Sequence, residues 1–199
     1  QFDLITTGKI EQGSLIFQDQ HLKRLQEAAR YFAYPFDEGK LKAELNQSLA
    51  ELDPSTDYRL RISIAKSGKV TCQLEKLQAL PETFCKAILV PQNANLQQPF
   101  TYFKTSYRPH LDLGQQEQIY HNAQGQLLES SIGNLVLQLD GHLYTPPVEL
   151  GLLNGIYRQH LLATGQATEK ILSLDDLKSA ERIYACNALR GLYELEIDN

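Results

Sequence analysis

The stretch "LLESSIGNLVLQLDGHLYTPPVELGLLNGIYRQ", residues 127–159, carries the clearest signals for the fold. Its first half predicts three short strands, "LLES", "NLVLQLD" and "HLYTP", because apolar residues run together and Asp140-Gly141 supplies a tight turn. Its second half predicts a helix that begins near Gly155, after a glycine-containing loop, and continues through "IYRQHLLATG". Short strands followed by a helix favour an α+β arrangement for this half of the chain.

The residues before this stretch alternate between predicted strands and helices. "FDLITT" and "SLIF" are expected to form strands joined by a turn at residues 11–13, and "HLKRLQEAARYF" has apolar residues at helical spacing. Asp37 has the position of an N-cap for a second helix. "DYRLRISIA" alternates strictly, so Arg59 and Arg61 are expected on the face opposite the apolar residues, and "VTCQL" returns as its hairpin partner.

A polar, amide-rich segment divides the chain. Residues 91–99 are bracketed by prolines and predict a linker between a small α+β domain, residues 1–90, and a larger, β-rich α+β domain, residues 100–199. In the larger domain "QEQIYH" and "RIYACN" predict further strands, and Ser173 begins a short helix with Asp176 in the capping-box position.

Composition excludes several classes of protein. The 199 residues carry a net charge of -5, which argues against a nucleic-acid-binding surface. No apolar run has the length of a membrane span, and the N-terminus lacks the pattern of a signal peptide. Three widely spaced cysteines fit reduced thiols in a cytoplasmic protein, and the five histidines share no metal-ligand spacing, so no metal site is expected.

Two residues have the chemistry of a catalytic site. Lys104 stands in "TYFKTSY", where apolar surroundings would lower the pKa of its amine and suit it for a Schiff base; a half-exposed strand lysine is the alternative. Glu129 follows two leucines and leads into an apolar strand. If it is buried it requires a cationic partner such as a protonated ring nitrogen, and otherwise it is a solvated strand end.

Two further features suit the binding of an anion. The helix start after Gly155 offers backbone N–H groups near Ile156 and Tyr157, although a plain glycine loop would have the same sequence. Arg24, in "HLKRL", has the geometry to bind a phosphate through two hydrogen bonds, or is surface charge.

Taken in order, these segments resemble the fold-type IV pyridoxal-phosphate enzymes, which include branched-chain aminotransferases, D-amino-acid transaminases and 4-amino-4-deoxychorismate lyases. The resemblance runs from about Ile5 to Gly191. It rests on "HLKRLQEAARYF", "FKTSYR", the stretch at residues 127–159 quoted above and "RIYACNALRG". It implies a two-domain architecture with a small α/β N-terminal domain, a larger pseudo-barrel C-terminal domain and the cofactor between them.

The resemblance also implies roles for single residues. Lys104 would bind pyridoxal 5′-phosphate covalently, and Glu129 would lie against the pyridine nitrogen. The cofactor phosphate would be bound by Arg24, by the backbone N–H groups at Ile156 and Tyr157, and by those around Asn187 and Ala188.

Three positions depart from the transaminase pattern. Transaminases of this family usually have a tyrosine where this chain has Pro109, Gly-Ile-Thr-Arg where it has Gly-Ile-Tyr157-Arg, and a small hydroxyl residue where it has Ala188. The lyase branch lacks the same features. The sequence therefore predicts a carbon-oxygen lyase of folate biosynthesis that converts 4-amino-4-deoxychorismate to 4-aminobenzoate and pyruvate. A D-amino-acid or branched-chain transaminase is the first alternative, and a dimeric or fused partner that has lost catalysis is the second.

The remaining expectations concern the substrate and partners. Arg108 and Arg190 are candidates for binding the two substrate carboxylates, with Thr7 as a hydrogen-bonding residue that joins Lys104 in catalysis. The family's sites usually form in homodimers. Residues 2–32 are also similar to the lyase half of proteins fused to aminodeoxychorismate synthase. The strand that precedes "FDLITT" in stand-alone members is absent, which fits a part of such a fusion or a trimmed chain.

Overall fold

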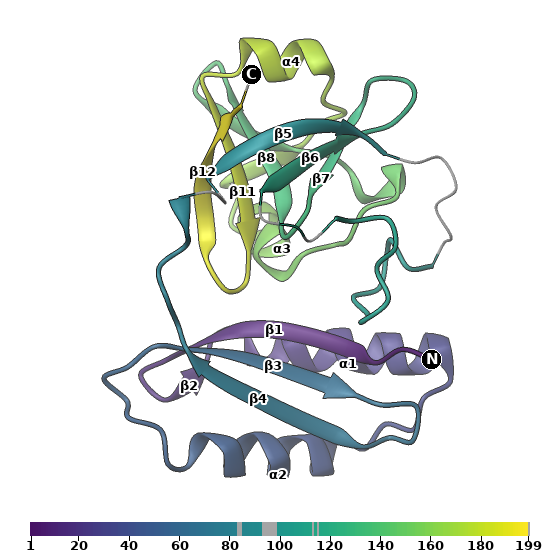
Figure 1. Cartoon of the computed structure of the whole chain (residues 1–199), viewed down its shortest axis with the longest axis vertical. Coiled ribbons are helices and arrows are strands. Elements are labelled where there is room, and N and C mark those ends of the chain that lie inside the picture. The colour runs from purple at the N-terminus through teal and green to yellow at the C-terminus, as the bar shows by residue number, and fades with distance from the viewer. Residues whose placement is uncertain (83–84, 93–98, 113, 115, 199) are drawn as a thin grey trace. The chain divides into compact units, whose positions relative to one another are not determined.

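The computed structural model describes residues 1–82, 85–92, 99–112, 114 and 116–198 (Figure 1). The chain forms two units. Unit 1 comprises Gln1–Ala79 and Phe103–Arg108, and unit 2 comprises Leu80–Tyr102 and Pro109–Asn199. This division crosses the domain boundaries expected from the sequence, because residues 86–91 form a strand of unit 2 and residues 103–108 return to unit 1. Most of the expected linker, residues 93–98, lies outside the described part of the chain.

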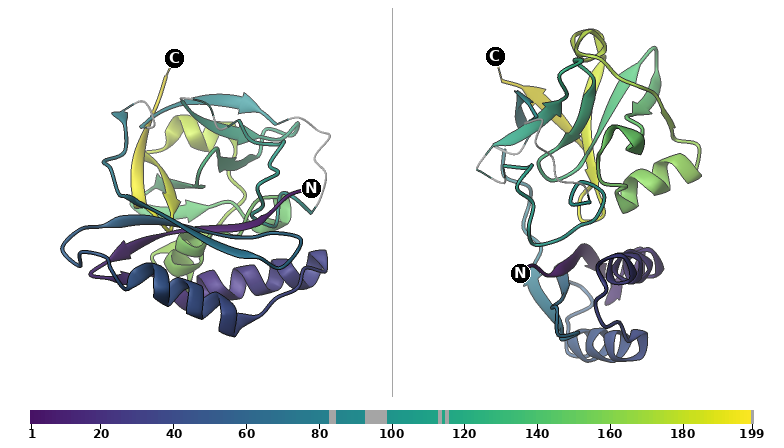
Figure 2. Two further views of the ribbon diagram at one scale, coloured as in Figure 1. Left: turned by 60° about the horizontal axis from the view of Figure 1, so that its bottom comes forward. Right: turned by 90° about the vertical axis from the view of Figure 1, so that its right-hand side faces the viewer.

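Unit 1 is a four-stranded antiparallel sheet with two helices on one face (Figures 1 and 2). The strand order is β2-β1-β3-β4. The elements are β1 (Leu4–Glu11), β2 (Ser14–Leu15), α1 (Gln18–Phe32), α2 (Glu38–Leu49), β3 (Tyr58–Ile64) and β4 (Val70–Lys76).

The two faces of this sheet differ in chemistry, as the alternation in β3 predicts. Leu60, Ile62 and Ile64 are buried in one apolar core with residues of α1 and α2. Successive side chains of a strand point to opposite faces. Arg59 and Arg61 therefore lie on the face of the sheet opposite the two helices, which we call the open face.

The start of α1 differs from the prediction. The expected strand "SLIF" ends at Leu15, and α1 begins at Gln18, three residues before His21. Phe17 adopts a left-handed conformation with φ 58°, which redirects the chain from strand to helix. The N-cap of α2 is confirmed, because Asp37 accepts a hydrogen bond from the Lys40 backbone N–H at 3.0 Å.

Unit 2 is built around a closed barrel. The strand order β10-β9-β8-β11-β12-β5-β6-β7 is completed by a pairing of β7 with β8, so six of the strands form a ring. This confirms the pseudo-barrel and the α+β class. The elements are β5 (Lys86–Pro91), β6 (Glu117–His121), β7 (Leu127–Ser130), β8 (Asn134–Leu139), β9 (His142–Thr145), the 3₁₀ turn η2 (Val148–Leu150), α3 (Ile156–Ala163), β10 (Ala167–Glu169), α4 (Leu174–Ser179), β11 (Arg182–Asn187) and β12 (Gly191–Ile197).

Helix α4 covers one end of the barrel (Figure 1), where Leu177 packs into the barrel core. The expected capping box is present. The Ser173 hydroxyl accepts from the Asp176 N–H at 3.1 Å, and the Asp176 carboxylate accepts from the Ser173 N–H at 2.7 Å. All three cysteines are free thiols. Of the helices in the described ranges, none combines the length and apolarity needed to cross a membrane.

Candidate active site

Lys104 is held in place as part of a short segment added to the edge of β1. The Ile5 N–H donates to the Lys104 carbonyl at 3.0 Å, and Leu4 is bridged to Thr105 in antiparallel register. Phe103 packs on the rings of Tyr31 and Phe32, with centroids 4.6 and 5.4 Å away. The residues on both sides of Lys104 are thus anchored, which fixes its backbone.

The register of this segment determines which way Lys104 points. Leu4 belongs to the apolar core, so its partner Thr105 shares that face, and Lys104 lies on the open face. Thr7 lies on the same face and is paired with Arg61 of β3. The sequence-predicted Lys104 and Thr7 therefore share one face of unit 1 with Arg61, which was not predicted as a site residue.

The charges around Lys104 favour its neutral amine. Burial lowers the pKa of Lys104 well below its usual value of 10.5, and four arginines add to the effect: Arg108, Arg24, Arg61 and Arg59. Burial is also the main reason that the pKa of Arg24 falls to about 10, followed by repulsion from Arg108. We call Lys104, Thr7, Arg24, Arg61 and Arg108 the lysine site.

A buried histidine supports the lysine site from the core side. His21 is fully buried on α1, and its Nδ1 lies 2.6 Å from the Thr6 hydroxyl. Burial first, then the charges of Arg24 and Lys104, lowers its pKa to about 3, so His21 is neutral at physiological pH. Gly8 leaves the space that His21 fills, since a Cβ there would lie 2.5 Å from the ring Nε2.

In unit 2, Glu129 lies on a β-bulge. Ile119 pairs with Ser130 and His121 with Leu127, so Leu128 and Glu129 together oppose the single residue Tyr120. A bulge of this kind bends the strand and redirects a side chain, and bulges are common next to active sites. Glu129 is 2% exposed, as its predicted contact with a ring nitrogen requires.

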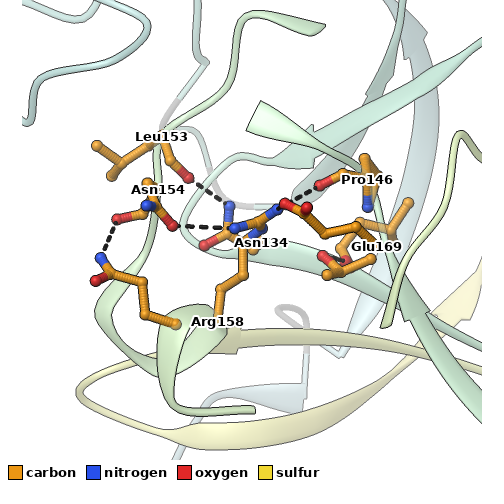
Figure 3. A network of polar contacts seen from close by, with 9 residues as sticks. Asn134, Pro146, Leu153, Asn154, Arg158 and Glu169 are labelled. Atoms are coloured by element: carbon orange, nitrogen blue, oxygen red, sulfur yellow. Dashed lines mark hydrogen bonds and ion pairs between the residues drawn. The ribbon is translucent and has the colours of Figure 1, made fainter. Parts of the chain in front are cut away.

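Asn134 connects Glu129 to the start of α3. The two residues are paired in the β7–β8 hairpin. The Asn134 amide donates to the Leu153 carbonyl at 2.7 Å (Figure 3), and a Cβ on Gly155 would lie only 1.9 Å from its Oδ1. Gly155 is the N-cap of α3 and provides no side-chain cap. The first N–H groups of a helix have no acceptor within the helix, so this helix start is suited to an anion.

The predicted turn around Asn187 lies beside these residues. Asn187 donates to the Ile132 carbonyl at 3.2 Å, and its side-chain oxygen accepts from the N–H groups of Leu189 and Arg190 at 3.0 and 2.9 Å. Tyr157 is close to the end of the turn, because its hydroxyl lies 3.4 Å from the position of a Cβ on Gly191. Ala188 and Arg190 belong to the same turn. We call Glu129, Asn134, Gly155, Ile156, Tyr157 and Asn187 the glutamate site.

The profile of the amino-transferase class IV family matches residues 3–195. This chain belongs to the amino-transferase class IV family.

Individual relatives of this chain carry the names of two activities. The chain is 25% identical, over 89% of its length and 82% of the relative's, to a Schizosaccharomyces pombe protein described as "Putative aminodeoxychorismate lyase". It shares a TM-score of 0.86 and 30% identity, over all of both chains, with the structure of a "Putative amino-acid aminotransferase" from Mesorhizobium loti. A "putative 4-amino-4-deoxychorismate lyase" from Haemophilus somnus has a TM-score of 0.74 and 25% identity, over 96% of this chain and 98% of that one.

The residues of both sites fit the pyridoxal 5′-phosphate of this class IV, fold-type IV family. The cofactor offers an aldehyde, a cationic ring nitrogen and a dianionic phosphate. The chain supplies a lysine of lowered pKa in the lysine site, and in the glutamate site a buried carboxylate and a helix start whose Gly155 leaves no room for a side chain. Each chemical group of the cofactor has a matching donor or acceptor.

Sequence reasoning did not single out three polar residues: Arg61 of the lysine site, Asn134 of the glutamate site, and Glu117. Arg61 is visible as a charged residue on the polar side of an alternating strand. Asn134 follows Glu129 with four residues between them, a spacing that is visible in the sequence. Glu117, at the start of β6, is completely buried and gives no signal in the sequence, because its neighbours in the barrel come from other strands.

Proposed function

We propose that this class IV protein is a pyridoxal-phosphate-dependent 4-amino-4-deoxychorismate lyase, which forms 4-aminobenzoate and pyruvate. The observation that carries the proposal is the first turn of α3, where Tyr157 packs near Gly191 and takes the place of the threonine whose hydroxyl meets the phosphate in transaminases. Pro109 and Ala188 depart from the transaminase pattern in the same direction. The identity to the Schizosaccharomyces pombe protein supports this branch.

In this proposal each residue of the two sites has a defined task. Lys104 attaches the cofactor, and Glu129 keeps the ring nitrogen protonated. The helix start at Ile156 and Tyr157, the turn at residues 187–190 and Arg24 bind the phosphate. When bound, the cofactor supplies an electron sink for the charge left by removal of a substrate proton.

The proton transfer is assigned to Lys104. Its lowered pKa favours the neutral amine, so Lys104, once the substrate amine has taken its place on the cofactor, is able to remove the proton from C4 of the substrate. The electron pair of that C–H bond then enters the ring while the ring carbon–oxygen bond to the enolpyruvyl group breaks. Protonation of the released enolpyruvate gives pyruvate, and the ring becomes aromatic. Thr7, on the same open face as Lys104, is placed to donate a hydrogen bond in this step.

The cations of the lysine site suit a substrate with two carboxylates. Arg108 and Arg61 are assigned to bind them, together with Arg190. Among the described residues Arg61 is flanked in the sheet by the neutral Thr7 and Gln73, and no ion pair occupies its guanidinium. A carboxylate is therefore the complementary ligand for this face.

The product mixture distinguishes the proposed reaction from transamination. Purified protein is incubated with 4-amino-4-deoxychorismate, and the fluorescence of 4-aminobenzoate is followed with and without a 2-oxo acid. The proposal predicts product in both samples. Amino transfer that requires the 2-oxo acid, without 4-aminobenzoate, would show that the chain is a transaminase.

A further inference from the structure

A buried arginine next to the glutamate site has no role in the proposed reaction. Arg158, in the first turn of α3, is 2% exposed. Its Nη2 donates to the Pro146 carbonyl at 2.9 Å and pairs with the Glu169 carboxylate, and its Nη1 donates to the Asn154 side chain at 3.0 Å (Figure 3). One guanidinium thus binds residues from three places in the chain.

These contacts join both ends of the loop that precedes α3. Pro146 begins the loop, and Asn154 is the last residue before the N-cap Gly155. The Asn154 carbonyl also accepts from the Gln159 side chain at 3.1 Å, and Asn134 holds the adjacent Leu153 carbonyl. The backbone immediately before the helix start is therefore fixed by side chains from β8 and α3.

Helix stability alone does not account for this arginine. A cation in the first turn opposes the positive end of the helix dipole, and a buried charge carries a desolvation cost that only well-placed partners offset. The contacts of Arg158 are directed to loop 146–155 and to Glu169, which points to a task in holding that loop.

We propose that Arg158 is a positioning residue that fixes the N–H groups at the start of α3 and thereby sets the preference of the protein for phosphorylated over unphosphorylated pyridoxal. Hydrogen bonds from rigid N–H groups to a phosphate lose little entropy on binding, whereas a loosened helix start has to be ordered by the ligand. The inference rests on the proposed binding of the cofactor phosphate at this helix start.

The test compares two ligands that differ only in the phosphate. Pyridoxal 5′-phosphate or pyridoxal is titrated into the protein, the sample is reduced with borohydride, and the labelled fraction of Lys104 is measured by peptide mass spectrometry. The variant Arg158→Met keeps an unbranched apolar stem, removes the guanidinium and leaves Glu169, which is 45% exposed, in contact with solvent. We expect the affinity for pyridoxal 5′-phosphate to fall at least about tenfold, from the loss of charge-assisted contacts, and the affinity for pyridoxal to change less than about twofold.

Two further variants make the result specific. Glu169→Gln removes the ion pair without removing Arg158, and is expected to lower the affinity for the phosphorylated ligand by a smaller factor. It also provides the test if Arg158→Met fails to fold. Arg182→Met, which removes a surface pair with Glu194 in the same unit, is the control and is expected to leave both affinities unchanged.

The possible failures are distinguishable. Equal losses for both ligands in Arg158→Met and in Glu169→Gln, or no loss for either, would overturn the positioning role while leaving cofactor binding intact. If neither ligand labels Lys104 in the wild-type protein, the proposed binding of the cofactor is wrong. The proposal that its phosphate binds at this helix start is then wrong as well. The readout is binding, so it does not depend on whether the reaction is elimination or transamination.

Discussion

Glu117 offers a quantitative test of the electrostatics inside the barrel. Its carboxyl group is completely buried, and the Ile132 N–H donates to its Oε1 at 3.4 Å. Burial raises its pKa from 4.5 to about 7, although hydrogen bonds from Ser130, Ile132 and Tyr193 act in the opposite direction. The folded protein therefore keeps a proton on Glu117 at pH values where the unfolded chain has lost it.

The sign of the stability change follows from proton linkage. Below pH 4.5 both states are protonated, and Glu117 has no effect on the pH dependence of folding. Between pH 4.5 and about 7 the folded state binds more protons than the unfolded state, so stability falls as the pH rises. At 1.36 kcal/mol per unit of pKa, the loss amounts to about 3 kcal/mol above pH 7. Glu117→Gln, which cannot ionise, is expected to avoid this loss.

The assay is urea unfolding at pH 4.5, 6 and 8, followed by far-UV circular dichroism because the chain has no tryptophan. The difference in unfolding free energy between Glu117→Gln and the wild type is expected to grow by about 3 kcal/mol from pH 4.5 to 8 in favour of the variant. The ionisation of His21 changes the unfolding free energy in the opposite direction, but it does so equally in the variant and the wild type, so it cancels in this difference. The control is Glu196→Gln on the exposed side of β12. A difference that stays constant with pH would refute a protonated Glu117.

Three further predictions concern the two sites. Gly155→Ala is expected to weaken pyridoxal 5′-phosphate binding at least about tenfold, because the added Cβ would overlap Asn134 and displace the helix start. The matched control Gly39→Ala is expected to leave binding unchanged. Isothermal titration measures the affinity of both variants. Arg61→Leu removes a positive charge near Lys104 and is expected to raise the pKa of Lys104. The labelling of Lys104 by pyridoxal and borohydride is therefore expected to shift to higher pH. A pH profile of labelling identical to that of the wild type would exclude Arg61 from the charges that act on the amine. The His21 ring signals in NMR are expected to stay constant from pH 5 to 8, since its pKa is about 3; a midpoint near 6.5 would contradict its burial as a neutral group.

Local patterns predicted most of the single elements correctly. Alternation in β3 identified its buried and open faces, and the caps at Asp37 and Ser173 were recognisable because each needs only residues within one helical turn. Strands β5 and β12 were not predicted. Strand β5 is marked by neither a hairpin turn nor strict alternation, whereas residues 193–197 of β12 do alternate between apolar and acidic side chains, a strand pattern that sequence reasoning missed. Their parallel pairing, Ile197 with Ala87, joins segments that are far apart in the chain.

The site was also predictable only in part, because its geometry depends on contacts between segments that are far apart in the chain. Lys104 and Glu129 were identified through the order of motifs in the family, whereas their geometry depends on long-range pairing. The face on which Lys104 lies is set by the bridge of Leu4 to Thr105, and the direction of Glu129 by a bulge opposite Tyr120. Neither feature has a signature within a short window of sequence.

The most direct test of the proposed reaction is the stoichiometry of products from 4-amino-4-deoxychorismate. We predict that wild-type protein, loaded with pyridoxal 5′-phosphate and given no 2-oxo acid, forms 4-aminobenzoate and pyruvate in equal amounts, and that Lys104→Ala forms neither. Equal rates from wild type and Lys104→Ala, or a wild type that consumes the substrate only when a 2-oxo acid accepts its amino group, would contradict the assignment of a lyase reaction to Lys104.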